Sequence, residues 1–513
     1  MNKNFYITTP IYYPSGKPHM GHAYSSIIAD IIARFKRLEG YDVFFLTGTD
    51  EHGQKIQKEA EKVKKDPKLF CDELSDKFKS LSKILNLSNN DFIRTTEKRH
   101  HFSVLEVWNR LVKSGDIYLD KYTGWYSVSD EAFYTNDEIE EINGQKKAIA
   151  SQSPVEWMDE ESYFFRLSKW EKPLLDYYNN NPDFISPSSR RNEVISFVKN
   201  GLKDLSVSRK SFSWGIPVPN NKDHVIYVWL DALTNYLSAL KYPDTKDILY
   251  KKFWPASIHL IGKDILRFHA VYWPAFLLAA KIPLPKKIYG HGWILSGEEK
   301  MSKSKGNILD PLEIIGKYGL DPLRYYLIKE VSFGNDGNIS QDRLEDCINS
   351  DLANNFGNLC QRVTAFTIKN CDGKVPNQIK FDNADLKILN KFSENLDLIR
   401  EKIDSQDLNF YIDFIINILF ETNKYFNDQE PWKKKDNMIR LNTIIYTTLE
   451  IVRKISFMLY PIIPQSSLKA LKIFGINENE IKLSSIINHD FLKPNQNINE
   501  IDILFQKIDK KND

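Results

Sequence analysis

One segment near the N-terminus limits the fold more than any other part of the sequence. Residues 5–13 are β-branched and aromatic, which predicts a strand, and a proline- and glycine-containing turn follows at residues 14–18. Residues 21–38 then carry apolar side chains at helical spacing, and residues 43–46 predict a second buried strand. Strand, turn, helix and strand form a βαβ unit, so we predict an α/β fold with a parallel sheet.

Two histidines flank a glycine where the first predicted strand gives way to its helix. His19, Gly21 and His22 lie at the start of that helix. Free N–H groups and the positive end of the helix dipole favour a phosphate there, and a glycine lets the backbone approach it closely. The H-x-G-H pattern is short, so two surface histidines beside a turn are the alternative interpretation.

A second basic motif lies far downstream, after predicted strands at residues 258–261 and 288–294. Lys300 and Lys303 are separated by a methionine and a serine and are followed by Ser304. Two lysines among small hydroxyl side chains suit an oxyanion whose charge develops during a reaction, while a solvated basic loop is the alternative. Together with H-x-G-H, this order of motifs resembles the class I aminoacyl-tRNA synthetases.

The resemblance implies a Rossmann-type catalytic domain that binds ATP, with Mg²⁺, at the switch point of the sheet. It implies no covalent enzyme intermediate, because the amino-acid carboxylate attacks the α-phosphate and the enzyme positions the reactants. The catalytic residues that it implies are His19, His22, Lys300 and Lys303. The ATP-binding residues that it implies are His19, Gly21, His22, Gly262, Asp264, His291, Gly292 and Lys303. For Asp264, a helix cap is the alternative.

Longer segments resemble the methionyl-tRNA synthetases in particular. They lie, in order, at residues 9–13, 45–53, 213–219, 227–232, 261–264, 268–269 and 273–274. At the matching positions the resemblance places the methionine-binding residues Ile11, Tyr13, Asp50, Trp229, Ala232, Leu233, Tyr236, His269 and Trp273. Aromatic rings favour the polarizable thioether of methionine, and a carboxylate at Asp50 pairs with its α-ammonium group. For each aromatic residue alone, ordinary core packing is the alternative.

The C-terminal part of the chain is predicted to be mostly helical. Asn354, Asn358 and Arg362 are spaced by four on a predicted helix over residues 346–369, so they share a face. With Trp432, they resemble the anticodon-binding residues of the family, in which an aromatic ring stacks on a base while polar side chains read its edges. A hydrophobic anchor after a proline is the alternative for Trp432.

The resemblance therefore implies an α/β fold of three parts. A Rossmann-type parallel-sheet catalytic domain carries an inserted connective domain and is followed by an α-helical anticodon-binding domain. We expect the first half of the catalytic domain at residues 1–114 and the insertion at 115–222. The second half, with the lysine motif and a stem-contact region, is expected at 223–345, and the anticodon-binding domain at 346–513.

Many members of the family bind zinc through cysteines of the insertion, but this chain has no cysteine between Cys71 and Cys347. We therefore predict no structural zinc and an insertion held by packing of Trp125, Tyr126, Phe133, Tyr134, Phe164 and Phe165. The four cysteines favour a reducing compartment. Without a targeting signal or a membrane-spanning apolar stretch, we expect a cytoplasmic protein. A dimerising appendage is also not recognisable, so we expect a monomer.

These expectations converge on a methionine–tRNA ligase that forms methionyl-adenylate from L-methionine and ATP. It would then transfer methionine to the 3′-terminal adenosine of tRNA(Met), both initiator and elongator. Three alternatives stay open: a class I synthetase for another large apolar or thiol amino acid, a small nucleotidyltransferase, and a non-catalytic tRNA-binding relative. Amino-acid-dependent exchange of pyrophosphate into ATP separates the last two from the main interpretation.

Overall fold

The computed structural model describes residues 3–14, 16–127, 132–142, 144–149, 151–296, 299–300, 310–377, 380–487 and 491–509. The chain forms two compact units. Unit 1 comprises residues 1–3, 19–43 and 291–513, and unit 2 comprises residues 4–18 and 44–290.

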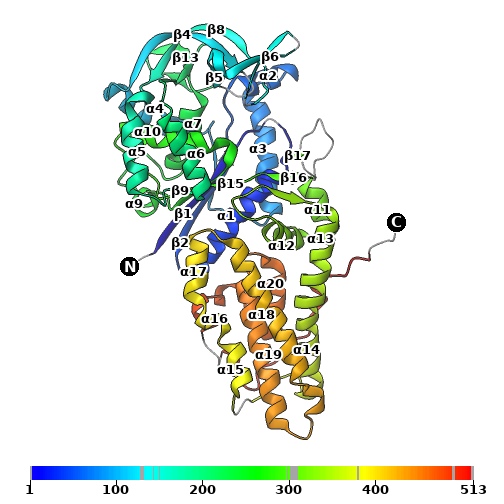
Figure 1. The fold of residues 1–513 in the computed structure, drawn as a ribbon. Coiled ribbons are helices and arrows are strands. Elements are labelled where there is room, and N and C mark those ends of the chain that lie inside the picture. The colour runs from blue at the N-terminus through cyan, green and yellow to red at the C-terminus, as the bar shows by residue number, and fades with distance from the viewer. Residues whose placement is uncertain are drawn as a thin grey trace. The chain divides into compact units, whose positions relative to one another are not determined.

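The large sheet belongs almost entirely to unit 2 and has the strand order β3-β2-β1-β14-β15-β9. Its strands are β1 (Asn4–Tyr12), β2 (Asp42–Thr49), β3 (Asp91–Arg94), β9 (Ile185–Ser186), β14 (Ile258–Gly262) and β15 (Ile288–His291). Figure 1 labels four of these strands, β1, β2, β9 and β15. Parallel pairing aligns Ile7 with Ile258 and Leu46 with Asp91. The predicted parallel sheet is confirmed. Because β1 lies beside β14, the strand order reverses there, which is where open α/β sheets bind ligands.

Helices of unit 2 bury the apolar side chains that parallel strands expose on their faces. They include α2 (Gln54–Lys62), α3 (Pro67–Ile84), α4 (Lys98–Lys113), α5 (Glu171–Asn180), α6 (Ser188–Lys199), α9 (Ile248–Phe253) and α10 (Trp273–Ala279). The core cluster of this unit contains Trp108 and Trp273, and Phe165 of the insertion contacts Phe276 with ring centroids 4.8 Å apart. The insertion and the sheet therefore share one hydrophobic core.

The insertion is built on a long antiparallel pair, β4 (Ile117–Ser127) and β8 (Glu156–Phe165). Around it lie β5 (Ala132–Tyr134), β10 (Leu205–Ser206), the hairpin of β6 (Ile139–Ile142) and β7 (Gln145–Ala148), and a small sheet of β11 (Ser208–Arg209), β12 (Pro217–Val218) and β13 (Asn221–Ile226).

Aromatic side chains pack this insertion, as predicted. Tyr126, Phe164 and Phe165 are buried, and the Trp125 ring contacts Trp157 at 5.0 Å while its Nε1 donates to Asn136 at 3.0 Å. Tyr134 is half-buried. The side chain of Phe133 lies outside the described residues.

Unit 1 begins its folded part with α1 (Met20–Leu38), the helix that the sequence predicted after the first strand. A three-stranded sheet in the order β17-β16-β18 follows, formed by β16 (Ile294–Ser296), β17 (Glu299–Lys300) and β18 (Gly337–Ile339). The helices α11 (Pro311–Tyr318) and α12 (Leu320–Glu330) lie between β17 and β18 in sequence.

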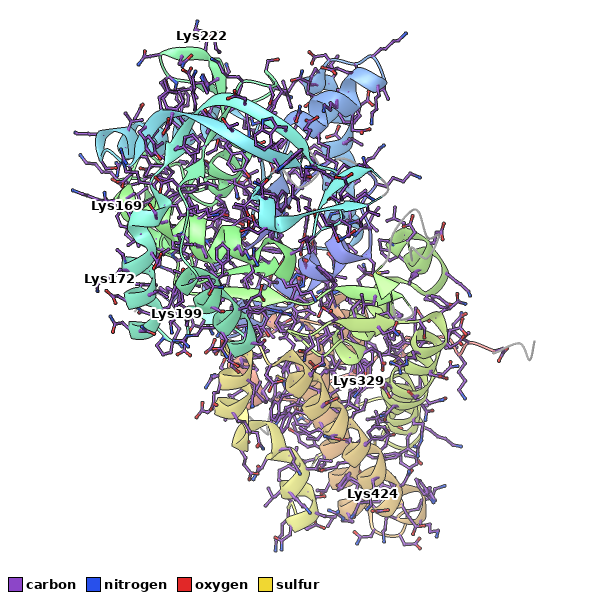
Figure 2. The ribbon with its side chains drawn as sticks, turned by 45° about the horizontal axis from the view of Figure 1, so that its top comes forward. Lys169, Lys172, Lys199, Lys222, Lys329 and Lys424 are labelled. Carbon is purple, nitrogen blue, oxygen red and sulfur yellow. The ribbon has the colours of Figure 1, made fainter. Side chains whose placement is uncertain are left out.

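Most of the remainder of unit 1, up to Ile486, is helical, as predicted (Figure 1). Its helices are α13 (Gln341–Cys347), α14 (Asn358–Asn370), α15 (Asn383–Leu389), α16 (Lys391–Glu394), α17 (Leu396–Asp404), α18 (Leu408–Asp428), α19 (Met438–Leu459) and α20 (Pro464–Leu471). The predicted helix over residues 346–369 is observed in three consecutive segments, because a π-helical stretch, Ile348–Gly357, joins α13 to α14. Figure 2 labels Lys329 of α12, which pairs with Asp413 of α18 at 2.5 Å.

A buried ion pair anchors α1 within unit 1. Arg324 of α12 donates to Asp30 of α1 at 2.7 Å and to the carbonyl oxygens of Pro461 and Ile462 at 2.9 and 2.7 Å. Both charged side chains are fully buried. Since a buried charge is tolerated only when it is paired and hydrogen-bonded, this junction fixes α1 against the helical region of the same unit.

Candidate active site

The residues that the resemblance assigned to methionine fall on adjoining short elements of unit 2. The helix α7 (Val228–Leu233) carries Trp229, Ala232 and Leu233, and α8 (Asn235–Ser238) carries Tyr236. A π-helical turn, Phe268–Tyr272, carries His269, and α10 begins at Trp273. The structure brings their rings together: the Tyr236 ring lies 5.8 Å from His269 and 6.2 Å from Trp273.

These side chains differ in exposure. Ala232, Leu233, Tyr236, His269 and Trp273 are buried, whereas Ile11, Tyr13 and Trp229 are half-buried. The Trp229 ring stacks on Phe268 at 3.6 Å with an interplanar angle of 10°. A buried base of aromatic rings below half-buried side chains is suited to an apolar substrate side chain that enters from solvent.

Hydrogen bonds settle the tautomer of His269. Its Nδ1 lies 3.0 Å from the carbonyl oxygen of Ile265, which can only accept, so Nδ1 carries the proton. Its Nε2 therefore accepts from the hydroxyl of Tyr236 at 2.7 Å. Burial lowers the pKa of His269 to about 4, and the ring is neutral at pH 7. Both ring nitrogens of His269 are thus used within the protein.

Asp50 lies directly after β2, at the carboxyl end of the sheet. Its backbone N–H donates to the carbonyl oxygen of Tyr12 at 3.0 Å, and only 8% of the residue is exposed. This hydrogen bond places Asp50 beside the end of β1, where Ile11 and Tyr13 flank Tyr12. A nearly buried carboxylate at this edge suits an ammonium group.

The sequence interpretation missed a buried histidine beneath Tyr236. His259 of β14 stacks on the Tyr236 ring at 4.0 Å and shares a hydrogen bond of 2.8 Å with the hydroxyl of Thr8. Burial and the nearby His269 lower the pKa of His259 well below its usual value. A lone histidine inside a predicted buried strand was the only signal for it.

The H-x-G-H motif forms the N-terminus of α1 in unit 1, as predicted. His19 is the N-cap: its Nδ1 accepts from the N–H of Gly21 at 3.1 Å, and Nδ1 of His22 accepts from the N–H of His19 at 3.1 Å. The two rings stack with centroids 3.7 Å apart. Burial and the nearby His19 lower the pKa of His22 well below its usual value. His22 is therefore neutral at pH 7, and it serves as a hydrogen-bonding group and not as a positive charge.

Four other ATP-binding candidates also have defined positions. In unit 1, His291 shares a hydrogen bond of 2.8 Å with Ser25 of α1. At Gly292, a Cβ atom would lie 2.1 Å from the carbonyl oxygen of Asn335, so only glycine fits. In unit 2, Asp264 is exposed inside a 3-10 turn, Lys263–Ile265, whose N-cap is Gly262. The alternative of Asp264 as a helix cap is therefore wrong.

The lysine motif is described only in part. The backbone of Lys300 pairs with Leu295 in the antiparallel β16–β17 ladder. Lys303, which we predicted to be catalytic, lies outside the described residues.

The predicted anticodon-binding residues all lie in the helical region of unit 1. Asn354 and Asn358 are exposed, and Arg362 is half-buried. Arg362 donates to Asn427 at 2.8 Å and lies over the Phe426 ring at 5.3 Å. That ring contacts Trp432 at 6.3 Å, and Trp432 is 42% exposed. Phe426 therefore connects the asparagine-bearing helix to the tryptophan.

Two further features bear on function. Among the described residues, no group of three or more histidine, cysteine or carboxylate side chains is arranged to hold a metal ion. In the same part of the chain, no helix has both the length and the apolar character needed to cross a membrane. Cys71, Cys347, Cys360 and Cys371 are free thiols.

The parallel sheet with its inserted domain, the histidine motif that opens α1 and the helical C-terminal region define a class I aminoacyl-tRNA synthetase. The family model described as tRNA synthetases class I (M) matches residues 5–148 and 140–364. The anticodon binding domain of methionyl tRNA ligase matches residues 375–513. The chain belongs to the methionyl-tRNA synthetase family.

Individual relatives agree with this assignment. Methionine–tRNA ligase of Rickettsia felis is 50% identical over 516 residues, which cover 99% of each chain. The Brucella suis enzyme is 49% identical over 486 residues, 94% of each chain. The structure of Mycobacterium tuberculosis methionyl-tRNA synthetase in complex with methionyl-adenylate has a TM-score of 0.95 and 45% identity, and covers 98% of this chain and 99% of that chain. The family, fold class and ligase class predicted from the sequence are confirmed.

Proposed function

We propose that this chain joins L-methionine to tRNA(Met), initiator and elongator, in two steps. Methionine and ATP first give methionyl-adenylate and pyrophosphate, and methionine then passes to the 3′-terminal adenosine of the tRNA. The observation that carries the proposal is the buried Tyr236–His269 hydrogen bond of 2.7 Å, set among Trp229 and Trp273 in the unit that also holds Asp50.

In the proposed pocket, a charged residue and apolar residues contact the two different ends of methionine. Asp50 pairs with the α-ammonium group, while Ile11, Ala232 and Leu233 contact the aliphatic chain. The rings of Tyr13, Trp229 and Trp273 contact the thioether, whose sulfur interacts favourably with aromatic faces and edges. A neutral His269, held by Tyr236 and Ile265, adds no charge to this apolar end.

In the activation step, a carboxylate oxygen of methionine attacks the α-phosphorus of ATP. The bond from that phosphorus to the oxygen bridging to the β-phosphate breaks, and pyrophosphate leaves with the electron pair. His19, Gly21 and His22, at the positive end of α1, bind phosphate oxygens. Lys300 and Lys303 stabilise the negative charge that develops on the leaving group. ATP enters as its magnesium complex, and Gly262, Asp264, His291 and Gly292 hold the nucleoside.

The helical region of unit 1 serves the second substrate. We propose that Trp432 stacks on an unpaired anticodon base and that Asn354, Asn358 and Arg362 contact base edges. Stacking on an exposed aromatic ring tolerates many bases, so sequence discrimination comes from the amide and guanidinium groups. We propose that residues 346–513 form the anticodon-binding domain and that residues 1–114, 115–222 and 223–345 keep the roles expected from the sequence.

We also propose that the enzyme acts in the cytoplasm, without structural zinc and as a monomer. The buried free thiols Cys71, Cys347 and Cys360 support a reducing compartment. Cell fractionation tests the compartment, and light scattering of the purified protein at micromolar concentration tests the monomer.

The decisive experiment is ATP–pyrophosphate exchange by the purified chain, with each of the twenty amino acids offered separately. Exchange with methionine alone is expected. Exchange with another amino acid would keep the synthetase class and overturn the pocket assignment. Absence of exchange with every amino acid would favour the non-catalytic tRNA-binding alternative.

A further inference from the structure

One buried carboxylate in unit 2 receives hydrogen bonds from two histidines that lie far away in sequence. Oδ2 of Asp231 lies 2.6 Å from Nδ1 of His52, and Oδ1 lies 2.6 Å from Nε2 of His100. The Asp231 and His100 side chains are fully buried, and 4% of the His52 side chain is exposed. Hydrogen bonds to an ionised group at such short distances are among the strongest in proteins.

Each member of this cluster is tied to an element that carries a methionine-pocket residue. His52 follows Asp50 by two residues, and Asp231 shares the six-residue helix α7 with Trp229. Nδ1 of His100 lies 3.0 Å from the hydroxyl oxygen of Ser238. Ser238 lies on α8, the helix of Tyr236. The carboxylate of Asp231 therefore connects three elements of the proposed pocket: the segment that follows β2, α7 and α8.

The segment that contains Asp50 is also fixed on its other side. Glu51 accepts hydrogen bonds from Arg94 at 2.6 and 2.9 Å. The backbone carbonyl of Glu51 accepts from Nε1 of Trp214 at 2.6 Å, and the Trp214 ring lies 5.5 Å from the ring of His52. Asp50 is thus followed by two consecutive residues whose side chains are held by hydrogen bonds, so we expect a change at His52 to shift Asp50.

The two carboxylate oxygens of Asp231 have different partners. Oδ2 accepts from Nδ1 of His52, and Oδ1 accepts from Nε2 of His100. The Ser238 hydroxyl, which lies beside Nδ1 of His100, also lies 3.0 Å from the carbonyl oxygen of Thr234, so His100 is linked to a serine that is itself bonded to the neighbouring helical turn. Because the Asp231 carboxylate is fully buried, removal of either histidine donor leaves a buried oxygen without that hydrogen bond.

We propose that Asp231 is a positioning residue for methionine binding, which holds Asp50, Trp229 and Tyr236 in one arrangement through His52 and His100. The inference rests on the proposed function. Asp231 does not touch the substrate; its effect passes through its two histidine partners. An asparagine at this position has the same shape, but it has one oxygen to accept a hydrogen bond and an NH₂ group that opposes the N–H of the second histidine. Asp231→Asn therefore loses the hydrogen bond to one of the two histidines, and the pocket element held by that histidine is no longer fixed.

The test is methionine-dependent ATP–pyrophosphate exchange by Asp231→Asn and wild-type full-length protein. The KM for methionine is expected to rise about tenfold or more, because one hydrogen bond to a buried charge is lost. The KM for ATP is expected to change less than about twofold, since the cluster joins pocket elements and not phosphate contacts. If the wild-type protein shows no exchange, the proposed function itself is contradicted. The positioning role of Asp231 is tested by comparing the variant with a fully active wild type.

The chain offers a matched control in the same unit. Asp116 is 1% exposed and accepts from Lys169 (labelled in Figure 2) at 2.7 Å, from Trp170 at 3.2 Å and from Ser114 at 2.6 Å, and none of these residues lines the pocket. Asp116→Asn is therefore expected to lower thermal stability with both KM values unchanged. If Asp116→Asn and Asp231→Asn gave the same kinetic parameters, the positioning role would be wrong.

Conservative substitution at His52 gives a second readout. The side-chain amide of His52→Asn can place an N–H near the position of Nδ1, whereas His52→Leu cannot. We expect His52→Asn to keep the methionine KM within about threefold of wild type and His52→Leu to raise it about tenfold. Equal methionine KM values for the two variants would overturn the proposal, even if both fold less stably.

Discussion

The Tyr236 hydroxyl donates a 2.7 Å hydrogen bond to Nε2 of His269, and both residues are almost completely buried. Because Nδ1 of His269 is committed to the carbonyl oxygen of Ile265, Tyr236 is the donor that satisfies the other nitrogen. The pair therefore fixes the orientation of an uncharged imidazole at the base of the proposed methionine pocket.

We predict that Tyr236→Phe lowers the free energy of unfolding by about 1–3 kcal/mol, because Nε2 of His269 is left buried without a donor. The methionine KM in pyrophosphate exchange should rise, since one of the two hydrogen bonds that orient the His269 ring is lost. Tyr242→Phe is the matched control: Tyr242 is 2% exposed and its hydroxyl has no hydrogen-bond partner among the described residues. Urea denaturation and exchange kinetics measure both effects, and equal behaviour of the two variants would contradict the prediction.

The protein should become less stable as the pH is lowered from 7 to 4. The pKa of His269 is about 4 in the folded state because burial disfavours its charge, against about 6.5 when unfolded. Between these values the unfolded chain binds the extra proton, so stability rises with pH. This contribution is complete above about pH 6.5 and is lost as pH falls towards 4, by up to about 3 kcal/mol.

Urea denaturation at several pH values, with His269→Gln for comparison, measures this contribution. The variant is expected to be less stable at pH 7 and to show a shallower decline between pH 6.5 and 4. Parallel curves for wild type and variant would show that His269 is not kept neutral by folding.

Trp432→Ala should weaken tRNA charging and spare amino-acid activation. Stacking of one base on an aromatic side chain contributes about 1–3 kcal/mol, so the KM for tRNA is expected to rise by about tenfold. Phe420→Ala removes another exposed aromatic ring, 54% exposed on α18, and should leave charging unchanged. A parallel loss of exchange and charging in Trp432→Ala would show that Trp432 stabilises the fold and does not act specifically in tRNA binding.

Lys303→Ala should reduce the rate of activation far more than the affinity for methionine. The ammonium group is proposed to stabilise charge that develops only as pyrophosphate leaves, and loss of one such donor reduces kcat by about 100- to 1,000-fold. Lys305→Ala, two residues further on, tests whether any lysine of this segment suffices. Unchanged turnover in Lys303→Ala would exclude the proposed role.

Removal of zinc should leave exchange intact. The insertion lacks cysteine ligands, and its strands are packed through Trp125, Trp157 and Tyr126. Exchange is therefore expected to be the same before and after treatment with a zinc-selective chelator, with Mg²⁺ in excess. Loss of activity that added zinc restores would show a zinc site that the sequence does not reveal.

Much of this molecule follows from local sequence. A run of β-branched and aromatic residues predicted β1, and the helical spacing of apolar residues predicted α1, because that spacing reports which side of a helix is buried. The order of the motifs around His19, Asp50 and Trp229 predicted the family, and four-residue spacing placed Asn354 and Asn358 on one exposed face. These features depend on neighbours within a few residues of one another.

Tertiary structure alone decided how the buried polar groups are paired. His52 and Asp231 are 179 residues apart, and Asp30 and Arg324 are 294 apart, so no local pattern relates them. The donor to His269 and the pairing of Asp231 with two histidines follow only once folding brings specific partners within about 3 Å. Local periodicity determines which segments form helices and strands. The packing of distant segments determines which nitrogen of a buried histidine carries the proton.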